Sequence, residues 1–194
     1  MNEVLKNMLT RRSIRRYAEA QVPEIELNEI LTAARFAPCG SNSQFWHFII
    51  IQSEPVLAEL NGLVRMAFAS LEVDMNTYVS MRGGKEASKR EDYAFFYRAP
   101  TLVVATNRKT YPNAMADCAC ALENMQLAAH SMGLGSCWIN QLTWFGEEPE
   151  IRAVLERIGM PEDEKVCGAL AIGFPEGSIP EAPSRKGEPF VYVR

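Results

Sequence analysis

The chain has 194 residues, of which 47% are hydrophobic and 23% are charged, and its formal net charge is -4. This composition is typical of a globular protein, and the length favours one domain with its own core. It excludes a helical membrane protein, because no apolar run approaches the roughly 20 residues that cross a bilayer. Residues 1–17 also lack the apolar stretch of a secretory signal, so we expect a cytoplasmic protein with no membrane partner.

The chain offers few residues for a metal site or a hydrolytic site. It contains five cysteines, no Cys-x-x-Cys pair, and only two histidines, His47 and His130. A closed zinc site needs paired cysteines or histidines at short spacing, so we expect no metal. The odd number of cysteines favours free thiols over a disulfide framework. Both histidines are interpreted as structural residues.

Charge is distributed unevenly along the chain. Four arginines stand between residues 11 and 16, whereas residues 147–164 hold seven acidic residues against two arginines. An acidic chain with one dense group of arginines is not typical of a nucleic-acid-binding protein, so we expect no nucleic-acid partner. The arginines and the hydroxyl of Ser13 are suited to bind a phosphate. A solvated basic turn is the simpler interpretation of the same run.

Hydrophobic periodicity predicts several helices. They cover residues 2–10, 24–36, 55–80, 114–132 and 147–158. The helix over 114–132 is apolar on nearly all sides, which is typical of a central helix or of one covered by a second subunit. Residues 81–92 are polar and contain two adjacent glycines, Gly83 and Gly84, so we expect a mobile loop that gates access to a site.

Apolar runs rich in β-branched residues predict strands over residues 46–52, 101–106 and 166–173. Residues 135–140 fit either a strand or a loop. The tail from residue 174 carries four prolines and is expected to extend over a surface. This pattern of helices and strands, with no repeat and no linker, predicts one α/β domain over residues 1–194.

The segment between the second predicted helix and the first predicted strand is rich in small and amide side chains. Small residues let the backbone approach a planar ligand closely, and amides offer donors and acceptors to ring edges. A loop that only ends a helix is the alternative interpretation. The candidate residues are Pro38, Cys39, Gly40, Asn42 and Gln44.

Two other features are weak signals when taken alone. The run from Gly133 to Trp138 is a poor phosphate loop, because it follows a helix instead of a strand. It also resembles part of a cysteine-protease signature, but no histidine follows Cys137, so this thiol is interpreted as a buried apolar group. Asp117 and Glu123 on the long helix are interpreted as a capping or partner-facing pair.

Taken in order, these segments resemble the flavin-dependent nitroreductase family. The resemblance rests on RRSIRRY near the N-terminus, a helix ending in AP, SNSQFWHF, RAPTLVVAT, GLGSCWI, and GALAIGFP followed by PSRK. It covers essentially the whole chain, and its most specific parts are RRSIR and the Asn-x-Gln-x-Trp loop. The family implies an α+β fold of three layers, in which helices flank a mixed central sheet. It also implies a homodimer with an extended C-terminal tail and FMN at each subunit interface.

The resemblance implies roles for individual residues at the phosphate end of FMN. Arg11, Arg12 and Ser13 are expected to hold the phosphate and the ribityl chain. Arg15 is expected near N1 and the C2 carbonyl, where a fixed cation stabilises the negative charge of the reduced ring. A phosphate is best neutralised from several sides, and the tail residues expected to return to it are Arg185 and Lys186.

At the ring end, the family implies that the loop of residues 38–44 comes from the partner subunit and lies along the isoalloxazine. The segment that flanks the ring face, with a backbone N–H near N5, comprises Trp138, Ile139, Asn140 and Gln141. Two departures from the family pattern concern this loop: Cys39 stands where serine is common, and Phe45 where proline is common. An apolar lid is expected from Phe45, Phe68, Tyr93, Phe95, Phe96 and Trp144.

The activity implied by the resemblance is that of an FMN oxidoreductase working by a ping-pong mechanism. NADH or NADPH delivers hydride to flavin N5 and leaves, and a nitroaromatic, a quinone or a related electron-poor acceptor then takes its place. No catalytic side chain is expected, because the flavin performs the chemistry. The alternatives are another flavin chemistry (dehalogenation or flavin breakdown), a non-catalytic flavin-binding sensor that uses Cys39 or Cys118, and a cysteine hydrolase.

Overall fold

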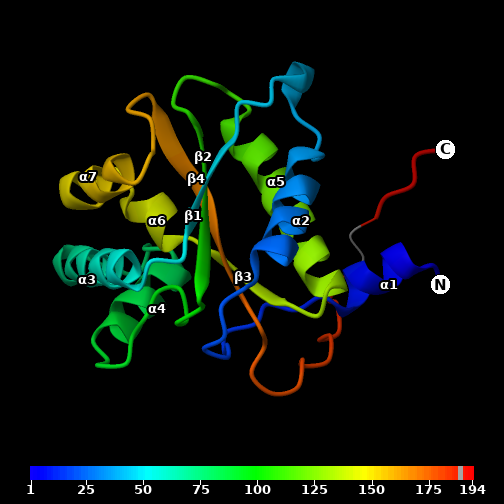
Figure 1. The fold of residues 1–194 in the computed structure, drawn as a ribbon, viewed down its shortest axis with the longest axis horizontal. Coiled ribbons are helices and arrows are strands. Elements are labelled where there is room, and N and C mark those ends of the chain that lie inside the picture. Colours follow the sequence, from blue (N-terminus) through cyan, green and yellow to red (C-terminus); the bar gives the residue numbers. More distant parts are fainter. Residues whose placement is uncertain (188–189) are drawn as a thin grey trace.

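We describe the protein from a computed structural model that covers residues 1–187 and 190–194. A four-stranded sheet lies between two layers of helices (Figure 1). The strand order is β1-β2-β4-β3, and each neighbouring pair is antiparallel. The strands are β1 (His47–Ile51), β2 (Thr101–Arg108), β3 (Gly135–Ile139) and β4 (Glu164–Gly173).

The two central strands are apolar because helices cover both of their faces. Seven of the eight residues of β2 are buried, and so are nine of the ten residues of β4. A strand buried on both faces reads as a continuous apolar run, not as an alternating one. This explains why the run from Leu102 to Ala105 predicted a strand so clearly from the sequence.

One face of the sheet is covered by α5 (Ala114–Ser131), which lies between the central strands and α2 (Glu24–Arg35). Leu122 and Met125 of α5 are fully buried, and small residues such as Ala121 let the helix approach its neighbours. The interpretation of this segment as a central helix is therefore confirmed.

The other face carries four helices packed around an aromatic core. Phe68 lies at the centre of this core, edge-on to Phe145 with ring centroids 4.8 Å apart. The four helices are α3 (Glu54–Ser70), α4 (Val79–Ser88), α6 (Gln141–Phe145) and α7 (Pro149–Arg157). The short helix α6 had no counterpart among the predicted elements.

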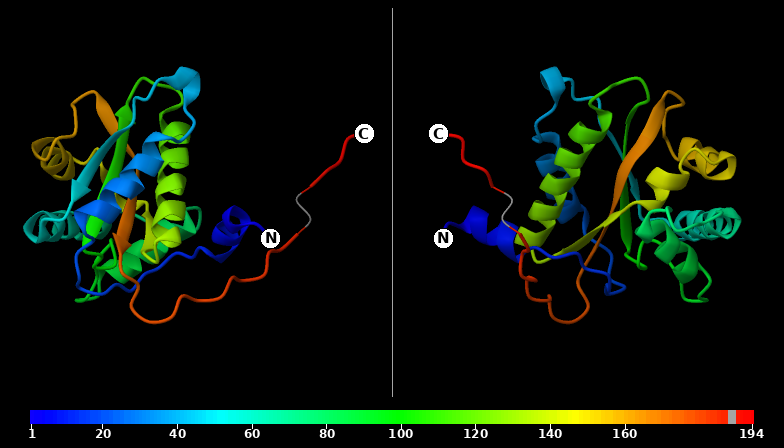
Figure 2. Two further views of the ribbon diagram at one scale, coloured as in Figure 1. Left: turned by 45° about the vertical axis from the view of Figure 1, so that its right-hand side comes forward. Right: turned by 180° about the vertical axis from the view of Figure 1, so that it is seen from behind.

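The helix α1 (Glu3–Thr10) and the C-terminal tail project from the body of the molecule (Figure 2). The side-chain amide of Asn7 donates to the carbonyl of Leu127 at 2.9 Å, which ties α1 to the end of α5. The start of the tail is fixed by backbone bonds from Ala18 N–H to Phe174 O at 2.9 Å and from Glu176 N–H to Arg16 O at 3.0 Å.

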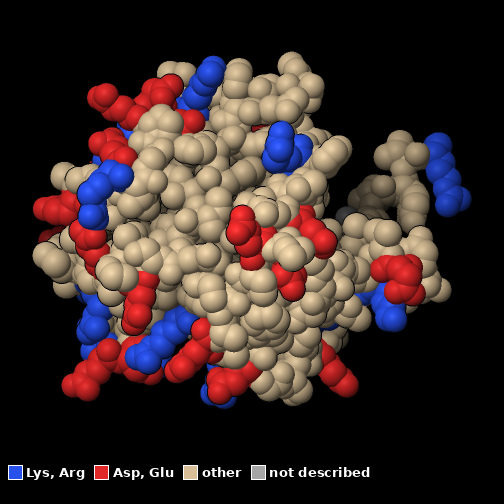
Figure 3. Space-filling model, in the orientation of Figure 1, with Lys and Arg blue, Asp and Glu red and all other residues tan. Residues whose placement is uncertain are grey.

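In the view of Figure 3, charged side chains of both signs crowd the side formed by α3, α4 and α7. The surface between them and α2 is largely uncharged. Among the described residues, no helix is both long enough and apolar enough to span a membrane.

The predicted helices and strands are found within a few residues of their predicted ends, with two exceptions. The helix predicted over 55–80 ends at Ser70. Between it and α4, the carboxylate of Asp74 accepts the N–H groups of Asn76 at 3.0 Å and Thr77 at 2.8 Å and forms a turn. Short polar side chains that bind nearby backbone groups in this way compete with helix formation.

The second exception is the loop expected over 81–92, which is wrong for residues 81–88 because α4 continues to Ser88. The two glycines do not break the helix. A Cβ on Gly84 would lie 2.5 Å from the Phe68 ring, so glycine lets α4 pack directly against the aromatic core.

The expected three-layer α+β architecture is confirmed. The pairing inside the sheet differs in one respect from the mixed sheet that we expected. The four strands are antiparallel throughout, and parallel pairing in the described part of the chain is limited to an isolated bridge between Ser13 and Ser136.

The burial of the α3 side chains predicts that two substitutions in this helix differ in their effect on stability. Leu60 is fully buried, whereas Met66 is 64% exposed. Leu60→Ala should lower the free energy of unfolding by about 2–5 kcal/mol, because it leaves a cavity. Met66→Ala should change it by less than about 0.5 kcal/mol. Urea unfolding of both variants measures this, and equal losses would contradict the packing described for α3.

Candidate functional site

The arginine-rich segment is fixed along the edge strand of the sheet. Ser13 forms its bridge with Ser136 of β3, and the Ile14 N–H donates to the Ser136 carbonyl at 2.9 Å. Three residues further on, the hydroxyl of Tyr17 donates back to the Ile14 carbonyl at 2.6 Å. The backbone therefore holds the arginines between α1 and β3, next to the segment that begins at Trp138.

The first two arginines of this segment differ in their surroundings. Arg11 Nη1 donates to Gln126 Oε1 at 3.3 Å, and its Nε lies 3.9 Å from Glu123 Oε1. Arg12 Nη2 donates to the Leu9 carbonyl at 2.5 Å, at the end of α1, while its Nε is buried and has no hydrogen-bond partner. A buried donor without an acceptor is costly, so this side chain is suited to receive an anion.

His130 lies beside the same arginines. Burial, together with the charges of Arg11 and Arg12, lowers the pKa of its imidazole, which favours the neutral ring at pH 7. Nε2 of the ring lies 2.9 Å from the Thr10 hydroxyl. These contacts support the interpretation of His130 as a structural residue.

A cavity of about 790 Å³ opens at one end of the sheet. Its walls come from the N-terminal segment, α4, the turn before β2, and the segment that follows β3. The lining side chains include Arg15, Tyr93, Tyr97, Arg98, Trp138, Asn140, Gln141 and Trp144. The sequence prediction named Arg15, Trp138, Asn140 and Gln141 for one site, and the fold brings these four to one cavity.

Arg15 is held in the cavity wall by Tyr97. Its Nε donates to Tyr97 Oη at 3.3 Å, and its guanidinium lies 5.6 Å from the centroid of the same ring. Tyr97 and Arg98 have φ angles of +57° and +56°, a left-handed conformation that non-glycine residues rarely adopt. Consecutive residues in this conformation are strained, and such strain is concentrated at functional sites.

The remaining walls of the cavity are aromatic and amide-bearing. Trp138 Nε1 donates to Asn140 Oδ1 at 2.6 Å, which fixes both side chains. The Tyr93 hydroxyl is buried without a hydrogen-bond partner, and burial raises its pKa to about 12. Trp144 packs edge-on against Tyr78 at 6.3 Å. This wall suits a planar ligand that stacks or forms few but specific hydrogen bonds.

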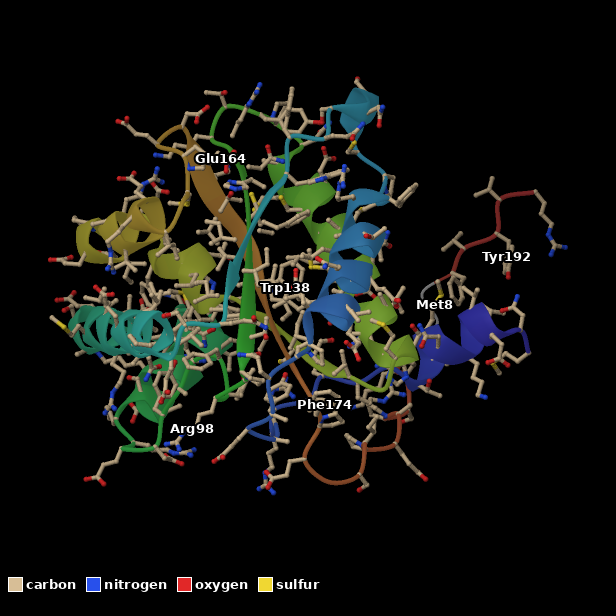
Figure 4. The ribbon with its side chains drawn as sticks, viewed as in Figure 1. Met8, Arg98, Trp138, Glu164, Phe174 and Tyr192 are labelled. Atoms are coloured by element: carbon tan, nitrogen blue, oxygen red, sulfur yellow. The ribbon has the colours of Figure 1, made fainter. Side chains whose placement is uncertain are left out.

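The loop of residues 38–44 lies at the other end of the sheet. Arg98 and Glu164 mark the two ends in Figure 4, and the loop leads into β1 at the Glu164 end. The eight residues of β2 span roughly 25 Å, so the loop cannot reach the cavity of its own chain. Gln44 lines a separate depression with Trp46 and His47.

Other predicted site residues are not brought to the cavity. The side chain of Ile139 is buried in the core. Arg185 and Lys186 are exposed on the tail, and neither is among the residues that line the cavity. Of the six residues expected in a lid, three line the cavity: Tyr93, Phe95 and Trp144.

The other three lid residues have different places. Phe68 and Phe96 are buried in the aromatic core. Phe45 lies beside the loop, where Arg108 covers its ring at 3.9 Å. These assignments failed because an aromatic residue in a sequence is equally suited to a core and to a ligand-binding wall. Gly83 and Gly84 do line the cavity, but from the helix α4.

The structure gives no support to a cysteine nucleophile. Cys137 is buried in β3, and burial raises the pKa of its thiol, although the nearby Arg15 opposes this effect. A reactive cysteine requires an accessible thiolate and an adjacent base. His47 lies beside Glu164 at the far end of the sheet, with Nδ1 3.4 Å from the carboxylate. In the described chain, no group of three or more metal-binding side chains is assembled.

Comparison with known proteins decides the family. The family model described as "Nitroreductase family" matches residues 8–174. The chain belongs to the nitroreductase family.

Several members of this family are similar over nearly their whole length. A relative from Archaeoglobus fulgidus named "Putative NADH dehydrogenase/NAD(P)H nitroreductase" is 31% identical over 91% of this chain and 87% of its own. A crystal structure of a nitroreductase with bound FMN from Bacteroides fragilis is 39% identical, covers 100% of both chains and has a TM-score of 0.89. An iodotyrosine deiodinase from Thermotoga neapolitana is 26% identical over 89% of each chain.

Three residues of the site were not predicted from the sequence. Tyr17 follows directly after the arginines, and Tyr97 and Arg98 follow a cluster of aromatics. The aromatic cluster gave a weak signal, but nothing in the pattern indicated that Tyr97 would reach Arg15 from 82 residues further along the chain.

Asp117 was expected to cap a helix or face a partner, and instead it faces the loop of residues 38–44.

A cysteine hydrolase would need an accessible thiol at Cys137, whereas the structure buries this thiol. Under native conditions at pH 7.5, iodoacetamide should modify Cys137 at least about tenfold more slowly than it does in the urea-unfolded chain, because the thiol is buried and protonated. Peptide mass spectrometry of timed samples measures the rate. Rapid native labelling of Cys137, accompanied by inactivation, would restore the hydrolase interpretation.

Proposed function

We propose that the chain is an FMN-dependent oxidoreductase that transfers reducing equivalents from NADH or NADPH to nitroaromatics, quinones or related electron-poor acceptors by a ping-pong mechanism. One observation carries the proposal. In a chain of the nitroreductase family, the arginine segment of residues 11–15 is fixed beside β3, and its Arg15 lines a cavity together with Trp138 and the amides that follow. The name of the relative from Archaeoglobus fulgidus and the FMN bound in the crystal structure from Bacteroides fragilis support the proposal.

The residues of the phosphate end fit FMN. The unpartnered Nε of Arg12 offers a donor to an anion, and Arg11 and the Ser13 hydroxyl lie next to it in the same fixed segment. Charge-assisted hydrogen bonds of this kind are the strong ones. In a dimer, Arg185 and Lys186 of the exposed tail are the further cations proposed for the phosphate.

The residues of the ring end fit a planar, polar ring system. Arg15 is preorganised by Tyr97, so a cation is available without reorganisation where a reduced ring accumulates negative charge. Asn140 and Gln141 offer amide donors and acceptors beside the aromatic wall. When bound to these residues, FMN would supply the hydride-transfer chemistry of the reaction.

The chain's own residues have binding and orienting roles in this proposal. Phe95 and Trp144 exclude water from one side of the cavity. With a pKa of about 12, the Tyr93 hydroxyl stays protonated at neutral pH, so it acts as a hydrogen-bond donor and not as a base. No side chain is required as a nucleophile, which agrees with the absence of a reactive cysteine from the cavity walls.

A homodimer is part of the proposal, because the loop of residues 38–44 reaches a cavity only on a second copy of the chain. Exposed apolar residues on the projecting elements support it. In α1, Val4, Leu5, Met8 and Leu9 are each at least 50% exposed, and Phe190 and Val191 of the tail are exposed too. Apolar groups gathered in this way mark interaction surfaces.

Reductive dehalogenation is the second candidate function. The relative from Thermotoga neapolitana named iodotyrosine deiodinase is the observation that favours it. Both candidates use a flavin, so the presence of FMN does not separate them. The identity of the acceptor that reoxidises the reduced protein does.

The isolated protein should be yellow, with close to one FMN per chain and twice the mass of one chain in solution. Adding NADPH or NADH should bleach the flavin absorbance, and menadione or a nitroaromatic should restore it. Stopped-flow spectroscopy measures both steps. A colourless protein that binds no added FMN would overturn the proposal, and reoxidation only by an iodinated phenol would favour dehalogenation.

Arg12 should contribute directly to FMN affinity. Arg12→Ala should weaken FMN binding by about 1.5–3 kcal/mol, the range for a hydrogen bond to a charged group. Lys6→Ala is the matched control, because it removes one positive charge from the adjacent α1, where the side chain is 64% exposed. Fluorescence titration of the apoprotein with FMN measures both affinities. An equal loss of FMN affinity in the two variants would mean that Arg12 contributes only its positive charge and no direct contact.

A further inference from the structure

The loop of residues 38–44 has a strained backbone. Ser41, Asn42 and Gln44 have φ angles of +53°, +52° and +51°, in the left-handed region that favours glycine. Each such residue is less stable than in a common conformation and persists only where its surroundings enforce it. Some part of the fold must therefore hold this loop in place.

The carboxylate of Asp117 is the centre of the contacts that hold the loop. Asp117 stands near the start of α5 and is only 5% exposed. It accepts the Gly40 N–H at 3.2 Å, the Tyr111 hydroxyl at 2.9 Å and the Ser43 hydroxyl at 3.4 Å. A buried carboxylate needs such donors, and here two of the three come from the loop itself.

Tyr111 connects this carboxylate to both ends of the loop. Its hydroxyl lies 3.2 Å from the Gly40 carbonyl and 3.1 Å from the Ser43 hydroxyl. Its ring packs edge-on against Phe45 with centroids 5.3 Å apart, and Arg108 covers the same Phe45 ring. The loop is thus fixed at its start by hydrogen bonds and at its end by ring packing.

The approach between the loop and the segment just before α5 is close enough to require glycine at one position. A Cβ on Gly40 would lie 2.6 Å from the Tyr111 hydroxyl and 2.4 Å from the side-chain amide of Asn113. Both distances are far below van der Waals contact. Gly40 therefore lets the backbone reach Asp117 and Tyr111 without displacing them.

From these contacts we infer that Asp117 and Tyr111 are positioning residues, which hold the loop in the strained form that presents Cys39, Asn42 and Gln44 to the flavin of the partner subunit. The inference rests on the proposed function for the identity of the ligand. The anchor itself rests on the contacts within one chain. Neither residue touches the cavity of its own chain, so both act through the loop.

Alkylation of Cys39 in the FMN-free apoprotein tests the anchor without depending on FMN. The Cys39 thiol lies inside the loop and accepts the Gln44 N–H at 3.4 Å, so release of the loop exposes it. Asp117→Ala should raise the rate of Cys39 labelling by iodoacetamide at least about tenfold, the factor for loss of one good hydrogen bond. Asp117→Asn, which keeps one acceptor for Gly40, should give a smaller increase.

Two internal controls separate local release from general loosening. Cys137 in β3 should remain slow in every variant. Asn124→Ala removes another hydrogen bond from α5, to the Ala33 carbonyl at 3.0 Å, and should leave Cys39 labelling unchanged. Unchanged Cys39 labelling in Asp117→Ala, or equal acceleration of Cys137, would overturn the anchor.

FMN affinity tests whether the loop held by Asp117 and Tyr111 contributes to flavin binding. Asp117→Ala and Tyr111→Phe should each lower FMN affinity, by about tenfold for Asp117→Ala, while Asp117→Asn should recover part of it. Gly40→Ala should reproduce the loss with Asp117 in place, because its Cβ displaces the Tyr111 hydroxyl. Wild-type affinity in Asp117→Ala would overturn the positioning role. A wild-type protein that binds no FMN would instead count against the proposed function, and the labelling rates would still decide the anchor.

Discussion

The backbone pairing of the N-terminal segment with β3 is the interaction on which the site depends. The Ser13–Ser136 bridge and the bond from Ile14 N–H to Ser136 O join segments more than 120 residues apart. Without this pairing, the arginines would form a solvated turn. With it, Arg15 lines one cavity with Trp138 and the amides that follow it, and Arg11 and Arg12 precede Arg15 in the same fixed segment.

Backbone strain in this protein is confined to two short segments. In the described chain, the non-glycine residues with left-handed backbones are Ser41, Asn42, Gln44, Tyr97 and Arg98. The first three belong to the loop anchored by Asp117, and the last two line the cavity. The fully buried core around β2 and β4 supplies the stability against which such strain is tolerated. The two segments lie at opposite ends of the sheet, which is consistent with a site shared between two chains.

Local sequence patterns predicted helices and strands well where burial alone decided which residues an element contains. The buried runs of β2 and β4 and the apolar stripe of α5 were recognised because burial on both faces leaves few polar residues. Prediction failed where tertiary packing overrode propensity. The glycines of α4 suggested a loop, but Gly84 provides the close contact with Phe68. In the same way, six aromatic residues were assigned to a lid, although Phe68 and Phe96 belong to the core.

The sequence by itself determined the family, the fold class and the groups suited to bind a phosphate and a planar ring, because these depend on residue type and order along the chain. Only the tertiary structure decided which groups meet. Tyr97 reaches Arg15, Asp117 holds the loop, and the loop lies at the end of the sheet opposite to the cavity of its own chain. The reason is that periodicity records which side chains are buried, whereas long-range contacts depend on strand order and register, which no local pattern carries.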